Sequence, residues 1–154
     1  MTPTELAFAA GLIEGEGTVR INKPTRRNRG ALLVSCVNTD RELIEFLQTR
    51  WPGYCKPATG LRPDQRPAFV WTIAARRALE FLDAIAPYVV SERMRERIAT
   101  ARWWQEIKAK HWRYRVEADY EEAFNCFHWM RELNARGVSC PSAEACPNAA
   151  EHRR

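Results

Sequence analysis

The chain has 154 residues, of which 45% are hydrophobic and 28% charged, and its formal net charge is +5. This length supports one compact domain with its own core, and no uninterrupted apolar run approaches the roughly 20 residues that a membrane span needs. We therefore expect a soluble globular protein rather than a membrane protein. The five cysteines are an odd number at irregular spacings, which favours a reducing intracellular setting such as the cytoplasm, nucleoid or organelle matrix.

The excess positive charge lies in the middle of the chain. Residues 1–17 carry three acids and no base, residues 18–77 carry twelve bases and four acids, and residues 78–154 carry twelve of each. A local excess of this kind is typical of a surface that neutralises nucleic-acid phosphates. The alternative is a generally basic, solvated surface, because many soluble proteins have basic patches.

The first predicted elements are a helix and a hairpin. Residues 2–5 form a capping box with Pro3 at the first helical position, and the helix is expected to run to about Glu14, where glycines end it. Residues 18–22 alternate apolar and polar side chains like a half-buried strand, and residues 31–37 return as a more apolar strand.

The same pattern then repeats. A second capping box at residues 39–42 opens a helix that Pro52 and Gly53 end. Residues 54–59 and 68–73 are predicted strands, and a third helix follows them and ends at Pro87.

These elements predict an α+β fold with an αββαββα core. Two hairpins favour a four-stranded antiparallel sheet with helices on one face and the other face open. Two further helices are expected, one after Ser91 and one ending near Gly137. We expect residues 1–137 to form a single domain and residues 138–154, which show no periodicity, to form a flexible tail.

The end of the first helix has an unusual composition. Ala7, Gly11 and Gly15 are four residues apart, so minimal side chains line one helix face and another backbone could approach closely. An internal glycine costs a helix about 1 kcal/mol relative to alanine, so Gly11 needs a packing reason, which a partner helix would supply. Glu14 and Glu16 lie at the negative end of the helix dipole, where two carboxylates suggest a hard divalent cation such as Mg²⁺.

Residues 9–17, Ala-Ala-Gly-Leu-Ile-Glu-Gly-Glu-Gly, resemble the LAGLIDADG motif of the homing endonucleases. Residues 4–100 are also similar to the core of that family in the order of helices and hairpins. With one copy of the motif, the resemblance implies a homodimer that makes a metal-dependent double-strand break in a long, nearly palindromic DNA target during intron homing. Glu replaces the commoner Asp at the motif's eighth position, and Ala9 replaces the opening Leu.

The resemblance also implies roles for individual residues. Glu16, at the eighth position, is expected to be the catalytic acid and to bind Mg²⁺ together with the backbone carbonyl of Gly15. The paired motif helices would place the dimer interface on Ala7, Ala10, Gly11, Glu14 and Gly15. Placed together at the two-fold axis, the two acids would address one phosphate on each DNA strand.

Further catalytic candidates come from the same resemblance. Asn38 and Thr39 lie where relatives place a polar residue that orders water. Relatives often carry a lysine shortly after the third helix, but residues 88–93 contain none, and Arg93 is the substitute candidate.

DNA recognition is expected from the sheet, because a β-ribbon can enter the major groove, and arginine, lysine, asparagine and glutamine can pair with bases or grip phosphates. Arg20 and Asn22 would lie on the open face, opposite the core residues Val19 and Ile21, but the phase of residues 31–37 stays open because both of their faces are apolar. The predicted DNA-binding residues are Arg20, Asn22, Lys23, Arg26, Arg27 and Arg29 in the first hairpin and Lys56, Arg62, Gln65 and Arg66 in the second.

Two other clusters favour simpler interpretations. Helical spacing makes most of the tryptophans of residues 102–114 packing residues, and the bases among them form a solvated edge or touch flanking phosphates. Cys126, His128, Cys140 and Cys146 lack the paired spacing of a zinc site. Two alternatives to the endonuclease remain open. One is a maturase that binds intron RNA. The other is a non-catalytic DNA-binding regulator, but such a protein would have no use for the two motif acids, Glu14 and Glu16.

Overall fold

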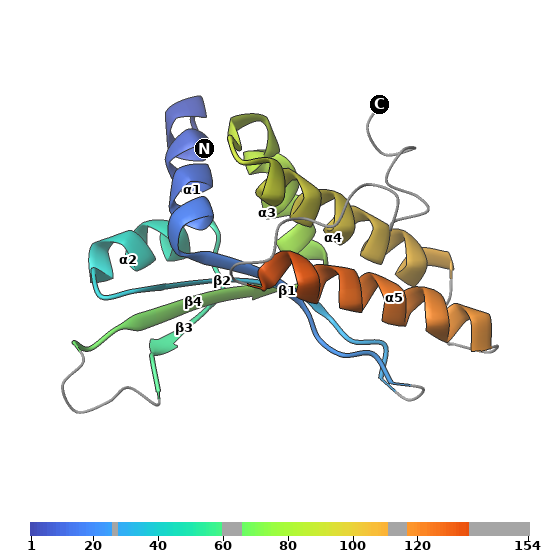
Figure 1. The fold of residues 1–154 in the computed structure, drawn as a ribbon. Helices are drawn as coiled ribbons and strands as arrows, with labels where there is room; N and C mark the ends of the chain where they lie inside the picture. Colours follow the sequence, from blue (N-terminus) through green and yellow to red (C-terminus); the bar gives the residue numbers. More distant parts are fainter. Residues whose placement is uncertain (26–27, 60–65, 111–116, 136–154) are drawn as a thin grey trace.

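A computed structural model describes residues 1–25, 28–59, 66–110 and 117–135. The predicted α+β fold and its αββαββα core are confirmed (Figure 1). The elements are α1 (Pro3–Glu16), β1 (Gly17–Ile21), β2 (Leu32–Asn38), α2 (Arg41–Arg50), β3 (Tyr54–Pro57), β4 (Phe69–Ala74), α3 (Ala75–Ile85), the 3-10 helix η1 (Ala86–Tyr88), α4 (Glu92–Lys110) and α5 (Glu117–Asn134). The predicted tail, residues 138–154, lies outside the described residues. None of the helices described is long and apolar enough to cross a membrane.

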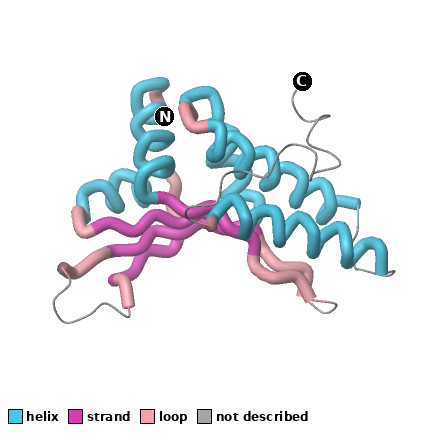
Figure 2. Tube along the Cα trace, viewed as in Figure 1, coloured by secondary structure: helices cyan, strands magenta, loops and turns pink. Residues whose placement is uncertain are grey.

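The four strands form one antiparallel sheet in the order β1-β2-β4-β3. The helices lie on one side of this sheet, and the opposite face is open (Figure 2). The β1–β2 hairpin and the β3–β4 hairpin extend in opposite directions from the centre of the sheet. The sheet therefore presents a broad arched face to solvent, as the two predicted hairpins require.

The strand register assigns every strand residue to a face, because residues directly opposite one another in an antiparallel pair point to the same side. Val19 lies opposite Val34, which lies opposite Ile73, and all three are buried beneath the helices. The expectation that Val19 and Ile21 face the core is confirmed. The register also settles the phase of β2, whose even-numbered residues Leu32, Val34 and Cys36 face the core.

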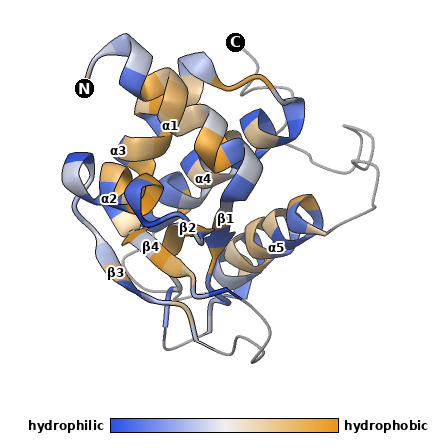
Figure 3. Ribbon diagram, turned by 90° about the vertical axis from the view of Figure 1, so that its left-hand side faces the viewer, coloured by the Kyte–Doolittle hydropathy of each residue, from blue (hydrophilic) through white to orange (hydrophobic). Residues whose placement is uncertain are grey.

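Aromatic packing fixes α2 and α3 on the covered face. Phe81 of α3 makes edge contacts with Trp71 of β4 and with Trp51 at the end of α2, at centroid distances of 5.4 and 5.3 Å. The buried indole N–H of Trp71 donates to the carbonyl of Trp51, so this polar atom is satisfied. Apolar residues are accordingly concentrated on α1, on α3 and along β4 (Figure 3).

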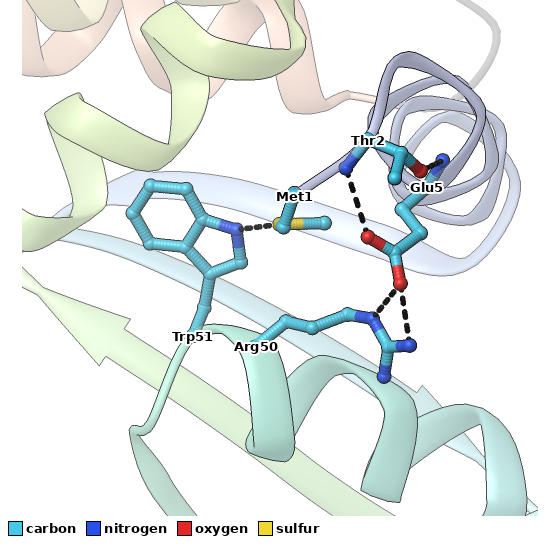
Figure 4. A network of polar contacts seen from close by, with 5 residues as sticks. All are labelled: Met1, Thr2, Glu5, Arg50 and Trp51. Carbon is cyan, nitrogen blue, oxygen red and sulfur yellow. Dashed lines mark hydrogen bonds and ion pairs between the residues drawn. The ribbon is translucent and has the colours of Figure 1, made fainter.

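The N-terminus of α1 is fixed to the end of α2 by a polar network (Figure 4). Thr2 and Glu5 form the predicted capping box, which is confirmed. The second carboxylate oxygen of Glu5 accepts hydrogen bonds from Arg50, and the indole N–H of Trp51 donates to the sulfur of Met1. The position of α1 over the sheet is therefore fixed at its start as well as at its end.

Two predicted helix boundaries need correction. Helix α1 continues to Glu16, two residues beyond the expected end at Glu14. Helix α2 is capped by Asp40, whose side chain accepts a hydrogen bond from the N–H of Glu42, and the predicted capping role of Thr39 is wrong. Asp and Thr are both good capping residues. The side chain of Asn38 accepts a hydrogen bond from the N–H of Asp40 in the turn before the helix.

Candidate functional site

Glu16 is the last residue of α1, and β1 begins at the next residue. The helix therefore places this carboxylate directly at the junction between helix and sheet, without an intervening loop. Glu16 is exposed, and no hydrogen bond or ion pair from the described residues reaches its side chain. A carboxylate left without a partner at the negative end of a helix is suited to bind a cation.

Gly17 makes this abrupt junction possible. A Cβ atom at this position would lie 2.5 Å from the carbonyl oxygen of Ile13, a distance that real Cβ atoms do not show. The backbone of Gly17 is extended (φ −88°), so glycine is required for space and not for a left-handed conformation, and its N–H donates to the carbonyl of Ile13. Any other residue would push the strand away from the helix end and displace Glu16.

Cys36 on β2 is paired with Gly17, and the negative charge of the neighbouring Glu16 affects the pKa of its thiol. Burial, and in second place the negative charge of Glu16, raise the pKa of the Cys36 thiol to about 11. The thiol is therefore neutral at physiological pH. Glu16 directly precedes Gly17 and therefore lies at the end of the β1–β2 pair.

Glu14, two residues earlier, is engaged within the protein. Its two carboxylate oxygens accept hydrogen bonds from the backbone N–H groups of Val90 (3.2 Å) and Ser91 (2.7 Å) at the start of α4. Burial acts to raise the pKa of Glu14, but the hydrogen bonds from Ser91 and Val90 and the charge of Arg95 outweigh it, and the pKa is lowered. Glu14 thus joins α1 to the start of α4 within one protomer. Its expected place at the dimer interface stays a prediction.

One chain offers few ligands for a metal ion. The carbonyl of Gly15 lies in the last turn of α1, where carbonyl groups lack helical partners, and it can join the carboxylate of Glu16. Among the residues described, no group of three His, Cys, Asp or Glu side chains could hold a metal ion. This donor set fits Mg²⁺, which keeps several waters and takes one or two carboxylates, better than it fits a metal that needs an all-protein cage.

Two residues of the group considered for a zinc site, Cys126 and His128, both lie on α5. Cys126 is buried in α5, and its thiol lies 3.6 Å from the carbonyl of Thr100 on α4. Cys140 and Cys146 lie outside the described residues. Trp104, from the aromatic segment, is fully buried, so its predicted packing role is confirmed.

The open face of the sheet carries a mixed set of polar and apolar side chains. Arg20 and Lys56, both predicted to bind DNA, are exposed on this face, in the strands at its two edges. Asn22 is exposed just beyond β1, where its N–H bonds to Ala31 and extends the hairpin. The two hairpins therefore bring predicted DNA-binding residues to both edges of one surface.

The centre of this face was missed by sequence reasoning. One register row crosses the whole sheet and consists of hydroxyl-bearing residues, namely Thr18, Ser35, Thr72 and Tyr54. Tyr54 is 65% exposed, so its ring and hydroxyl are available to a ligand. Thr72 could have been assigned to the open face from the sequence, because it lies between two apolar residues that face the core. Ser35 could not, because the sequence did not show which side of β2 faces the core.

The remaining predicted DNA-binding residues differ in their placement. Lys23 lies 5.9 Å from the ring centroid of Phe124, and the guanidinium of Arg29 donates to the carbonyl of Lys108, so both reach the helical layer instead of the open face. Arg66 is exposed at the start of the strand segment that leads into β4. The other four, Arg26, Arg27, Arg62 and Gln65, lie outside the described residues.

Two of the three secondary catalytic candidates, Arg93 and Asn38, make hydrogen bonds within the protein. Arg93 donates hydrogen bonds to the carbonyls of Leu133 and Ala135 at the end of α5, so two nitrogens of its guanidinium are engaged within the protein, and its catalytic role stays a prediction. Asn38 lies on the covered face of β2, and its side chain accepts a hydrogen bond from the N–H of Asp40. Thr39 is exposed in the turn that follows.

Helix α1 has an exposed face of small residues. Ala7, Gly11 and Gly15 are exposed, and a Cβ atom at either glycine would meet nothing within 4 Å. Ala10 was predicted to lie at the dimer interface, but it is fully buried in the protomer's own core, and that prediction is wrong. Phe8 was missed: it is 46% exposed beside this stripe and packs edge-on against a ring of α2.

Comparisons with solved structures find close matches in fold, although no family model and no curated protein matches the sequence. The homing endonuclease I-CvuI in complex with its target matches with a TM-score of 0.65 and 13% identity, covering 90% of this chain and 86% of the other. The archaeal intron-encoded homing endonuclease I-Vdi141I, complexed with DNA, matches with a TM-score of 0.65 and 15% identity over 88% and 87%. The LAGLIDADG homing endonuclease I-SmaMI, bound to cleaved DNA, matches with a TM-score of 0.55 and 16% identity over 95% of this chain and 47% of the other. The sheet, its helical layer and the helix that delivers Glu16 together have the fold of the LAGLIDADG homing endonucleases.

Proposed function

We propose that this chain is a site-specific DNA endonuclease of the homing type, which acts as a homodimer and requires a divalent cation. The observation that carries the proposal is Glu16, a carboxylate without a partner among the described residues, held at the junction between α1 and an open sheet. The proteins that share this fold include one solved with its target and one solved with cleaved DNA. The end of α1 places a carboxylate beside the open face of the sheet. A carboxylate in this position could bind a divalent cation next to the phosphodiester of a bound DNA.

The open face supplies the proposed DNA-binding surface. Arg20, Asn22 and Lys56 can contact bases or phosphates from the two hairpins. The hydroxyls between them can donate and accept hydrogen bonds at base edges. Arg20 and Lys56 supply positive charge on this surface and would release counterions from bound DNA.

Mg²⁺ is the proposed cofactor, held by the carboxylate of Glu16 and the carbonyl of Gly15. A bound divalent cation would stabilise the negative charge that develops on the phosphate and lower the pKa of a coordinated water. The protein's own contribution is to hold the carboxylate at a fixed position, since Gly17 leaves no flexible linker between α1 and β1. The catalytic role therefore rests on the geometry of the end of this helix.

The proposed dimer would pair the exposed face of α1 with its copy. Ala7, Gly11 and Gly15 permit close approach of two backbones, and Phe8 provides apolar area beside them. The chain covers most of I-CvuI but only 47% of I-SmaMI, so it corresponds to about half of the longer chain. Two copies of this chain would place two Glu16 carboxylates together, one for each DNA strand.

The decisive experiment compares wild type with Glu16→Gln. Duplexes that bind the wild-type protein are selected from a randomised, nearly palindromic library and then incubated with Mg²⁺. We expect the wild type to cleave both strands, and Glu16→Gln to lose at least about 100-fold in cleavage rate while it still binds the same duplex. Undiminished cleavage by Glu16→Gln would remove its catalytic role, and selection of structured RNA in place of duplex DNA would favour the maturase alternative.

A further inference from the structure

The helical layer supports the two hairpins unequally. The β1–β2 hairpin lies beneath α4 and α5, and its residues make several contacts with these helices (Figure 1). All four residues of β3 in the other hairpin are exposed. Helices α4 and α5 follow the αββαββα core, so this support is an addition to the core fold.

The first contact is a pair of hydrogen bonds, one in each direction, between the hairpin and the end of α4. Arg29 donates from its guanidinium to the carbonyl of Lys108, and the ammonium of Lys108 donates back to the carbonyl of Gly30 at 3.4 Å. The carbonyl of Lys108 lies in the last turn of α4, where a cationic donor also complements the helix dipole. Both side chains are half-buried, and burial, followed by the nearby positive charge of Arg29, lowers the pKa of the Lys108 ammonium.

The second contact is packing of the hairpin backbone against Trp104. Gly30 has a left-handed conformation (φ +68°), and a Cβ atom there would lie 2.4 Å from the carbonyl oxygen of Asn22 and 3.2 Å from the ring of Trp104. The side chain of Trp104 is fully buried, and the backbone at Gly30 packs directly against its ring. Gly30 is therefore the residue that lets the hairpin lie close to α4.

The third set of contacts comes from α5. Phe124 lies 5.9 Å from the ammonium of Lys23, which is a cation–π contact. The side-chain amide of Asn134 donates to the carbonyl of Val19 at 2.8 Å. Because β1 is an edge strand, this hydrogen bond covers a backbone group that would otherwise be free to pair with another chain.

We propose that α4 and α5 hold the β1–β2 hairpin in its DNA-reading conformation before DNA binds, with Arg29, Lys108 and Phe124 as positioning residues. Arg20 and Asn22, on the open face of the same hairpin, are then presented to DNA with little further loss of conformational entropy. The base pairs read by this hairpin are discriminated more strictly than those read from β3, whose four residues are all exposed. This inference rests on the proposed function, because it concerns how that DNA surface is organised.

Hydrogen exchange on the free dimer tests the positioning itself. Lys108→Met removes the ammonium that reaches Gly30, and Phe124→Leu removes the ring beneath Lys23. Each variant is expected to speed amide exchange in the β1–β2 hairpin by about tenfold and to leave the β3–β4 hairpin unchanged. Arg102→Ala is the matched control, since Arg102 also lies on α4 but pairs on its surface with Asp83, and it changes neither hairpin.

Selectivity on DNA tests the functional consequence. With duplexes selected by the wild type, Asn22→Ala identifies base pairs read by the first hairpin, and Lys56→Ala identifies those read by the second. Lys108→Met and Phe124→Leu are expected to relax discrimination by about tenfold at the first group only, with the dependence of affinity on salt unchanged. A salt slope reduced by about one would instead make Lys108 a phosphate contact and overturn its positioning role.

The outcomes separate this inference from the proposed function. If the wild type selects no duplex, the endonuclease proposal fails, while the exchange experiment still decides whether α4 and α5 order the hairpin. If DNA is bound and cleaved but neither variant changes exchange or selectivity in the first hairpin, the positioning proposal is wrong. Phe124→Leu keeps an apolar side chain, so it retains the fold if Lys108→Met lowers stability.

Discussion

Glu14 and Glu16 are separated by one residue, yet their carboxylates have opposite surroundings. Glu14 accepts two backbone N–H groups from the start of α4, whereas the carboxylate of Glu16 has no hydrogen bond from the described residues. A carboxylate that is already satisfied gains less from a cation than one that faces solvent alone. This difference assigns Glu14 to holding the fold together and Glu16 to the proposed chemistry.

Glu14→Gln is predicted to destabilise the protein by about 1–2 kcal/mol at pH 7, since it removes the charge from two hydrogen bonds. The hydrogen bonds lower the folded pKa of Glu14 below the ordinary value of 4.5. The stabilisation is therefore complete above that value and is lost as the pH falls through the folded pKa. Urea unfolding of both proteins between pH 3 and pH 8 measures the difference.

Glu16→Gln is the control for this experiment, because it makes the same chemical change at the same end of α1. Its stability is expected to stay within about 0.5 kcal/mol of wild type at every pH. A stability difference for Glu14→Gln that does not shrink at low pH would contradict the assigned role of its charge.

The site could be predicted from sequence only where local pattern decides placement. Glu16 was predictable because the motif fixes its place at a helix end, and Arg20 because it alternates with buried residues. Lys23 and Arg29 were assigned to DNA on residue type alone. Their contacts with Phe124 and Lys108, far along the chain, depend on how α4 and α5 fold back, and no local pattern contains that information.

At the scale of elements, α4 and α5 are joined at one end by arginine side chains. Arg93, in the first turn of α4, donates to the carbonyls of Leu133 and Ala135, and Arg97 donates to Leu133 as well. These carbonyls lie at the end of α5, where helical partners are missing and positive charge is favoured. Arg93 therefore acts as a cap supplied by a neighbouring helix.

Arg93→Met is predicted to lower the free energy of unfolding by about 1–2 kcal/mol, because the carbonyls at the end of α5 lose a charged donor. The cleavage rate per folded dimer, measured well below the melting temperature, should stay within about twofold of wild type. Arg102→Ala, which removes an exposed ion pair between α4 and Asp83 of α3, should change stability by less than about 0.5 kcal/mol. A large loss of cleavage with unchanged stability would return Arg93 to the catalytic site.

The order and type of the core elements were predictable because each has a strong local signal. The capping box of Thr2 and Glu5 defines the start of α1, and alternation defines β1. Strand order was not predictable from such signals, since β3 lies at the edge of the sheet and β4 next to β2. The pairing of β2 with β4 is long-range and depends on burying Val34 and Ile73 together.

At the scale of the whole molecule, one face of α1 in the protomer is exposed and packs against no other described part of the chain. Gly11 and Gly15 leave space above α1, and a glycine inside a helix costs about 1 kcal/mol relative to alanine. The protomer gains nothing from this arrangement, because no described atom approaches either position. A second copy of α1 against the first would use the space and offset the loss.

Substitution of Gly11 separates the needs of the protomer from those of the proposed dimer. Gly11→Ala should stabilise the protomer by up to about 1 kcal/mol through helix propensity. Gly11→Leu should leave it folded, since its Cβ meets nothing within 4 Å, but should weaken dimerisation by at least about 100-fold by forcing the two helices apart.

Sedimentation velocity over a range of concentrations measures this loss, and circular dichroism confirms the fold. Ala118→Leu on the exposed surface of α5 is the matched control and should dimerise as the wild type does. Because each strand break needs its own Glu16, double-strand cleavage by Gly11→Leu should fall with its dimer population. A Gly11→Leu protein that dimerises and cleaves like the wild type would show that α1 does not form the interface.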